Sequence, residues 1–178
     1  MAGLTQDSTL NKLILLFIFD KMEMPLSENT IIDLCKNKNN WIEYVDLKIA
    51  LEQLLEANFV CKMPNGTGEP FYNITVEGRV CLAHFFVRIP SSSREMISNY
   101  IKNSRMNYRR RQEYSSKYEK CDDGTYDVTL CITDSMQVVL ELKMNVPNRS
   151  TAKYIDKNWG DKAAKVYSAI YDNLVDQP

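Results

Sequence analysis

The sequence predicts an α+β protein, with helices and a β-hairpin in its N-terminal half and an antiparallel sheet covered by a helix at its C-terminal end. Two observations carry this prediction. Between residues 43 and 87 the apolar period changes from that of a helix to that of two short strands, and then back. Between residues 117 and 146 apolar side chains alternate with period two. We therefore expect an N-terminal domain at 1–90, a long linking helix at 91–116 and a sheet with its helix at 117–178.

Three helices are expected before the hairpin. The first, at 8–22, is apolar around most of its circumference, which is typical of a helix buried on more than one side. The second begins after Ser27, whose hydroxyl is placed to cap it, and ends near Cys35. The third covers 43–57, and Asn58 follows where a left-handed C-terminal cap is needed.

The hairpin and a fourth helix come next. Strands are predicted at 59–63 and 71–74, on either side of a tip at 64–70 that is rich in glycine and proline. Thr75 is placed to cap a helix at 76–87. The side chains expected to point inward from this helix are Val80, Cys81, Phe85 and Phe86.

The linking helix is predicted to start with a capping box formed by Ser92 and Glu95, and to reach about Tyr114. Its apolar face carries Ile97, Tyr100, Ile101 and Tyr108.

Three strands are predicted after the linking helix, at 117–121, 125–133 and 137–146, with a hairpin turn at Asp122-Asp123-Gly124. One face of this sheet must be covered. The last helix supplies the cover through an apolar stripe, although Gly160 is expected to break or kink it. The stripe consists of Ile155, Trp159, Ala163, Val166, Ile170 and Leu174.

The composition is that of a folded globular protein. The chain has 178 residues, 44% of them hydrophobic and 25% charged, and its formal net charge of −1 gives no overall attraction to nucleic acid or to an anionic membrane. The most apolar run, 13–19, is far shorter than the roughly 20 residues that cross a bilayer. The five cysteines form no CxxC pair. We therefore expect a cytoplasmic protein that does not enter a membrane.

Two segments carry a resemblance to known families: Leu51-Glu-Gln-Leu-Leu-Glu-Ala-Asn-Phe-Val60 before the hairpin and Tyr72-Asn-Ile-Thr-Val-Glu-Gly-Arg79 after it. Through them, residues 8–87 resemble winged helix-turn-helix proteins, in particular the transcription regulators of the PadR and MarR kind. The whole chain is similar to a bacterial family of uncharacterised winged-helix proteins, with matching residues at 142–147 and at Asn158-Trp159. The resemblance implies a winged-helix fold, with double-stranded DNA as partner and regulation of transcription as function.

The candidate DNA-binding residues lie on the second and third helices, on the hairpin and at the basic end of the linking helix. The third helix is a poor match to phosphate, because residues 43–56 hold four acids and one base. The densest positive charge is at 94–120, which holds eight bases and three acids. Two alternatives to DNA contact stay open for this charge: a solvated helix end whose cations interact favourably with the helix dipole, or pairing with the acids at 121–148. The candidates are Ser27, Thr30, Lys36, Lys38, Tyr44, Lys48, Gln53, Lys62, Asn65, Arg105, Arg109, Arg110 and Arg111.

A homodimer is expected through the first helix, which is apolar nearly all round, and the long helix from Ser92, because regulators of this type pair through helices that flank the winged domain. The competing hypothesis is a winged helix without DNA binding, which serves as a protein-interaction module or carries a C-terminal region that binds a small effector. The sequence does not identify such an effector.

No enzyme, cofactor or metal site is expected. His84 is the only histidine, and its place between Ala83 and Phe85 in a helix is more typical of a core or interface residue than of a catalytic one. The sequence contains no nucleophile motif, and its cysteines lack the spacing of zinc ligands.

Overall fold

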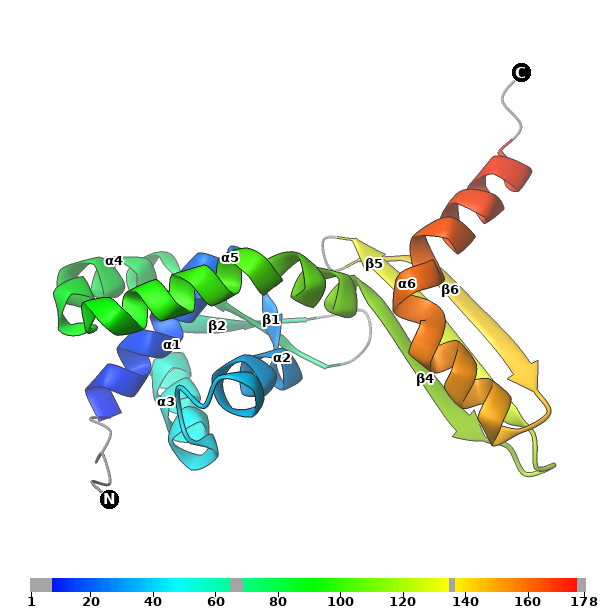
Figure 1. Ribbon diagram of the computed structural model, residues 1–178, viewed down its shortest axis with the longest axis horizontal. Coiled ribbons are helices and arrows are strands. Elements are labelled where there is room, and N and C mark those ends of the chain that lie inside the picture. Colours follow the sequence, from blue (N-terminus) through cyan, green and yellow to red (C-terminus); the bar gives the residue numbers. More distant parts are fainter. Residues whose placement is uncertain (1–7, 65–68, 135–136, 176–178) are drawn as a thin grey trace. The chain divides into compact units, whose positions relative to one another are not determined.

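The computed structural model describes residues 8–64, 69–134 and 137–175, which form two compact units; the chain passes from the first to the second between Tyr108 and Arg109. The predicted α+β class is confirmed: helices dominate the N-terminal part, and a three-stranded antiparallel sheet and a long helix follow (Figure 1). Each unit has its own hydrophobic core.

The N-terminal unit contains a small sheet among helices. Its strand order is β1-β3-β2, because the two-residue strand β1, which the sequence pattern did not predict, pairs with β3. The elements are α1 (Ser8–Met22), β1 (Leu26–Ser27), α2 (Glu28–Ile32), the π-helical turn η1 (Asp33–Lys38), α3 (Tyr44–Glu56), β2 (Val60–Met63), β3 (Phe71–Ile74), α4 (Val76–Phe85), the 3-10 turn η2 (Phe86–Arg88) and α5 (Ser91–Glu113), which reaches into the second unit.

Helix α1 forms the centre of this unit's core. Its bounds are those predicted, and Leu15, Ile18 and Phe19 are completely buried. Burying side chains of this size contributes roughly 1.5–3 kcal/mol each. The apolar circumference of α1 is therefore explained by packing inside one chain.

The caps predicted at Ser27, Asn58 and Thr75 are confirmed. Ser27 Oγ accepts a hydrogen bond from the Thr30 amide at 3.2 Å, and Thr75 Oγ1 accepts one from the Gly78 amide at 3.0 Å. Asn58 has a φ of 57°, in the left-handed region. The second helix extends past its predicted end, because the π-helical turn continues the coil to Lys38.

The inward face of α4 differs in part from the prediction. The predicted inward residues Cys81 and Phe86 are partly buried against the core, but the other two predicted residues are not inward. Val80 and Phe85 are 52% and 46% exposed, whereas Gly78 and Leu82 are buried. The cause is a close approach of α4 to the start of β2, where a Cβ on Gly78 would lie 2.1 Å from the Phe59 carbonyl oxygen. Glycine therefore sets which side of α4 faces the core.

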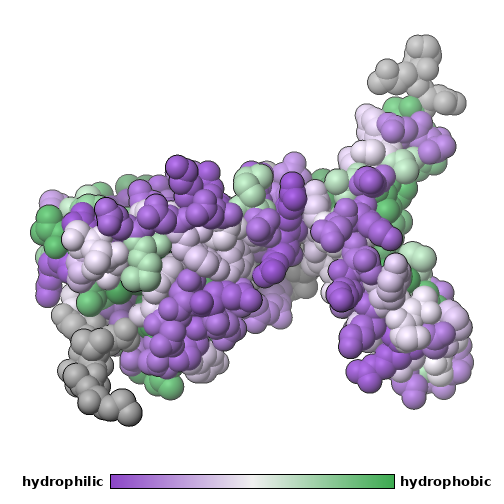
Figure 2. Space-filling view, in the orientation of Figure 1, coloured by the Kyte–Doolittle hydropathy of each residue, from purple (hydrophilic) through white to green (hydrophobic). Residues whose placement is uncertain are grey.

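Helix α5 begins at Ser91, so that Ser92 lies inside the first turn instead of at the predicted cap position. Its inward face is as predicted, since Ile97, Ile101 and Tyr108 are buried. The remaining surface of α5 is mostly hydrophilic (Figure 2).

The C-terminal unit is an antiparallel meander with the order β4-β5-β6 under α6. Its strands are β4 (Tyr114–Lys120), which follows α5 directly and starts before its predicted position, β5 (Tyr126–Asp134) and β6 (Gln137–Val146). The predicted turn is confirmed, with Gly124 at a φ of 87°.

Helix α6 (Arg149–Leu174) covers one face of this sheet as predicted. It is continuous through Gly160, so the helix has no break there, and it changes direction near its middle, as the expected kink would require (Figure 1). Its Trp159 is buried, and the indole Nε1 donates a hydrogen bond to the Cys131 carbonyl at 3.1 Å. This bond ties α6 to the central strand β5.

The five cysteines are free thiols. Among the residues that the structure describes, no helix has the length and apolar character needed to cross a membrane.

Candidate nucleic-acid interface

A polar cluster joins α2, α3 and the hairpin. The Glu28 carboxylate accepts hydrogen bonds from Lys48 Nζ and, at 3.2 Å, from the Tyr72 hydroxyl. Lys62 Nζ lies 5.9 Å from the centre of the Tyr72 ring. The structure thus brings together two predicted DNA-binding residues, Lys48 and Lys62, with an acid and a tyrosine that the sequence analysis did not select.

The charges in this cluster are mutually stabilised. The hydrogen bond from Lys48 lowers the pKa of Glu28, and the same bond raises the pKa of Lys48. Burial, and then the negative charge of Glu28, raise the pKa of Tyr72. At neutral pH Glu28 therefore neutralises the one base of α3.

The outward side of α3 is apolar and acidic. Val45 and Ile49 are 65% and 44% exposed, and Glu52 and Glu56 lie on the same stripe of the helix, at spacings of three, four and seven residues. This side of α3 offers no free cation to a phosphate backbone, since Lys48 is paired with Glu28.

Several other candidates on α2 and the following turn have structural partners. Ser27 and Thr30 form the cap of α2, where their hydroxyl oxygens lie 2.9 Å apart and Thr30 is buried. Lys36 Nζ contacts Glu43 Oε2 at 2.5 Å, while Lys38 is exposed. Asn65 lies outside the residues that the structure describes.

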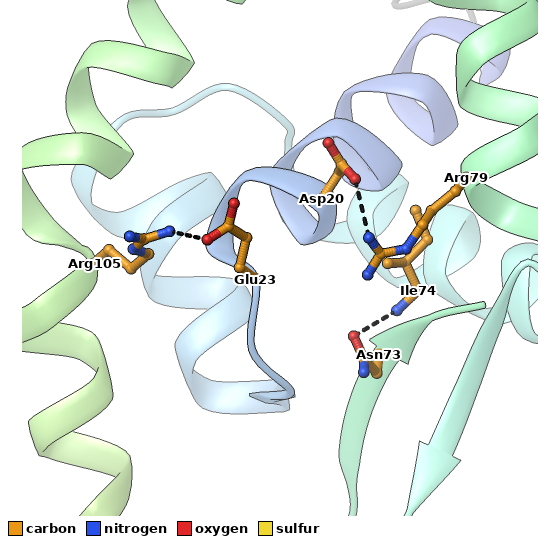
Figure 3. A network of polar contacts seen from close by, with 6 residues as sticks. All are labelled: Asp20, Glu23, Asn73, Ile74, Arg79 and Arg105. Carbon is orange, nitrogen blue, oxygen red and sulfur yellow. Dashed lines mark hydrogen bonds and ion pairs between the residues drawn. The ribbon is translucent and has the colours of Figure 1, made fainter. Parts of the chain in front are cut away.

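The arginines at the end of α5 divide between the two units, and Arg105 and Arg109 each contact an acid. Arg105 belongs to the N-terminal unit and lies 2.5 Å from Glu23 at the end of α1 (Figure 3). Arg109 belongs to the C-terminal unit and contacts Glu113 at 2.6 Å, and this contact raises the pKa of Arg109. Arg110 and Arg111 are exposed.

Arg79 on α4 forms a further ion pair, at 3.5 Å from Asp20 on α1 (Figure 3). Together with the Arg105–Glu23 pair, it attaches α4 and α5 to the C-terminal end of α1. Both contacts join exposed or half-buried side chains, so each is worth about 0–1 kcal/mol.

A small apolar cavity of about 210 Å³ lies in the N-terminal unit among α1, α3 and α4. Leu13, Leu16 and Leu54 form part of its wall, and Lys12 and Gln53 also line it. Gln53, which is exposed, therefore lies beside α1. No local sequence pattern indicates this cavity, because its walls come from helices far apart in the chain.

Catalytic residues were not expected, and the described residues contain no group of three side chains able to hold a metal ion. His84 is exposed on α4 and is therefore not a core residue.

Comparison with known proteins gives a family assignment without an activity. No curated protein and no solved structure matches this chain. A family described as a domain of unknown function, DUF4364, matches residues 11–174, which include most of both units. The chain belongs to the DUF4364 family.

Proposed function

We propose that this protein is a homodimeric DNA-binding regulator of transcription with an N-terminal winged helix of the PadR and MarR kind. The observation that carries the proposal is the order of elements in the N-terminal unit: α2 and α3 are followed directly by the β2–β3 hairpin, and β1 pairs with β3. In a winged helix the second helix of such a pair enters the major groove and the hairpin contacts the neighbouring backbone. The free thiols favour the reducing cytoplasm as its location.

In this proposal, base or sugar contacts and phosphate contacts come from different exposed residues. Tyr44 and Lys62 are exposed near the α3 and hairpin surface, where they serve base or sugar contacts. Arg110 and Arg111, which are exposed and belong to the C-terminal unit, are the proposed source of phosphate contacts made by that unit. The proposal assigns no catalytic activity to the chain.

The test is the binding of fluorescent random duplex DNA, followed by anisotropy over a series of salt concentrations. Salt-sensitive binding is expected, and each lost phosphate contact lowers the slope of log K against log salt by about 0.9. Arg110→Ala with Arg111→Ala should lower the slope, whereas Lys153→Ala with Lys157→Ala, which removes the same charge from exposed positions on α6, should not.

A gain-of-charge variant provides the converse test. Glu28→Gln keeps the size of the side chain and releases Lys48 from its ion pair, so tighter binding and a steeper salt slope are expected if α3 lies against DNA. The absence of salt-sensitive binding at low ionic strength would refute DNA binding for wild type.

A second candidate function is a protein-interaction module, and the exposed Val45 and Ile49 beside Glu52 and Glu56 favour it. Apolar residues ringed by charge are common at protein interfaces. Under this function Val45→Ser with Ile49→Ser abolishes association with a protein partner, and wild type shows no salt-dependent affinity for DNA. Under the DNA function the same variant keeps the salt slope of wild type.

A further inference from the structure

The outer strand of the C-terminal sheet has an apolar row that α6 leaves partly uncovered. The row consists of Leu140, Leu142 and Met144 on β6. They lie opposite three residues of β5 and therefore share the face of the sheet with them; these are, in the same order, Ile132, Leu130 and Val128. Val128 is fully buried beneath α6, whereas its neighbour Met144 is 45% exposed. Hydrophobic residues accordingly reach the surface of the C-terminal unit (Figure 2).

The other edge of the sheet is covered on this face. Helix α6 contacts β4 more extensively than β6, and Ser116 Oγ on β4 donates a hydrogen bond to Asp156 Oδ1 at 2.5 Å. Tyr118 on β4 is half-buried against Tyr126, with ring centres 6.3 Å apart. Both edge strands, β4 and β6, have an unpaired backbone edge, and of these two it is β6 that also carries the uncovered apolar row.

We propose that β6 pairs with β6 of a second copy of this chain, antiparallel and about a two-fold axis centred on Leu142. The two sheets then form one continuous six-stranded sheet with both α6 helices on the same face. Leu142 lies opposite itself and Leu140 lies opposite Met144 of the other copy, so each apolar row covers the other. An isologous pair of this kind satisfies the backbone of both edges.

Charge complementarity selects this register. Glu141 and Lys143 lie on the opposite face of β6, 3.5 Å apart within one chain. With the axis at Leu142, each Glu141 faces Lys143 of the other copy. An axis at Glu141 would place two glutamates opposite each other, and an axis at Lys143 would place two lysines opposite each other, both of which are unfavourable.

The β6 edge also takes the place of one pairing surface that the sequence predicts for the dimer, the first helix. The sequence suggested the first helix as a pairing surface, but α1 is buried in the core of its own unit. The proposal does not depend on DNA binding, because it uses only the surface of the C-terminal unit.

The first test is sedimentation velocity of the full chain across micromolar concentrations, with a charge-swap series. Wild type should be a dimer. Glu141→Lys and Lys143→Glu should each raise the dimer dissociation constant at least about tenfold, because each replaces two attractive pairs by two repulsive ones. The double variant Glu141→Lys with Lys143→Glu should restore the dimer, since it exchanges the charges without changing the register.

The matched control is Glu119→Lys on β4, where Glu119 lies 3.9 Å from Lys117 in a similar exposed pair. It should leave the dimer intact. A monomeric wild type, a dimer insensitive to Glu141→Lys, an equal effect of Glu119→Lys, or a double variant that stays monomeric would each overturn the proposal. Circular dichroism confirms that each variant is folded.

The second test fixes the register by disulfide cross-linking under mild oxidation. Leu142→Cys should yield a covalent dimer joined at position 142, because residues directly opposite in an antiparallel pair have Cβ atoms about 4.5–5.5 Å apart. Leu140→Cys should yield none above the wild-type background. Cross-linking of the second variant alone would overturn the proposed axis. A dimer without affinity for DNA would refute only the proposed function, and a DNA-binding monomer would refute only this interface.

Discussion

Gly78→Ala should strongly destabilise the N-terminal unit, although alanine is the better helix former. The added Cβ would lie 2.1 Å from the Phe59 carbonyl oxygen and 2.9 Å from Ile74 Cγ1. Ordinary contacts between such atoms are about 3.5 Å, so α4 must move away from the corner between α3 and β2. The obstacle is backbone, which cannot rotate away as the end of a flexible side chain can.

Two hydrogen bonds oppose that movement. The Thr75 amide donates to the Phe59 carbonyl at 3.0 Å, and Thr75 Oγ1 donates to the Asn58 carbonyl at 2.8 Å. Overpacking lowers the free energy of unfolding by about 1–3 kcal/mol, and weakening the two hydrogen bonds lowers it by about 1 kcal/mol each. Replacing a helical glycine by alanine raises it by about 1 kcal/mol. The expected loss is about 2–4 kcal/mol, which for a unit of this size lowers the melting temperature by on the order of 10–20 °C.

The two tryptophans make the assay specific, because Trp41 lies in the N-terminal unit and Trp159 in the C-terminal unit. Thermal unfolding followed by Trp41 fluorescence in a Trp159→Phe background reports the N-terminal unit. Gly160→Ala is the control, since its Cβ would meet nothing within 4 Å. It should leave the Trp41 transition unchanged. If Gly78→Ala in the Trp159→Phe background has the same melting temperature as Trp159→Phe alone, the close approach of α4 to Phe59 is refuted.

Three further substitutions test individual contacts. Tyr108→Phe should cost about 1.5–3 kcal/mol in urea unfolding, because the buried Tyr108 hydroxyl donates to Asp33 Oδ2 at 3.1 Å; an unchanged midpoint would show that the bond is not stabilising. Glu28→Gln should lower stability near neutral pH, and its deficit should vanish on acidification. The folded-state pKa of Glu28 is depressed by Lys48, so the contribution is present above the ordinary glutamate pKa of about 4.3 and is lost as the pH falls through the lower folded value. Gly124→Ala should weaken the β4–β5 turn by about 1–2 kcal/mol, since its φ of 87° is strained for alanine, and faster amide exchange in that turn would report it.

Local signals in the sequence predicted most elements of this fold. A cap needs only a hydroxyl or a left-handed residue at one position, so Ser27, Asn58 and Thr75 were identified without any knowledge of the tertiary structure. The turn at Gly124 was found for the same reason. Strand β1 was missed because two residues cannot show a period, and its existence depends on pairing with β3.

The errors arise where a long-range contact overrides a local pattern. The apolar pattern of α4 selected Val80 and Phe85, but the missing side chain of Gly78 decides which side packs against β2. Likewise, Lys48 and Glu28 are 20 residues apart, and no spacing rule predicts their ion pair. The charge of α3 available to a ligand is for that reason more negative than its sequence suggests.

The salt slope of DNA binding tests DNA binding and β6 pairing together. If β6 pairs two chains, one particle carries two sets of Arg110 and Arg111, and the salt slope for DNA binding contains contributions from both. Removing these arginines from a dimer should then lower the slope by about 3.6, against about 1.8 for a monomer with the same contacts. Glu141→Lys provides the decisive comparison, because it keeps every arginine, adds a positive charge and separates the copies. A slope that falls by about half in this variant would mean that DNA binds the β6-paired dimer, whereas an unchanged or steeper slope would mean that each chain binds DNA independently.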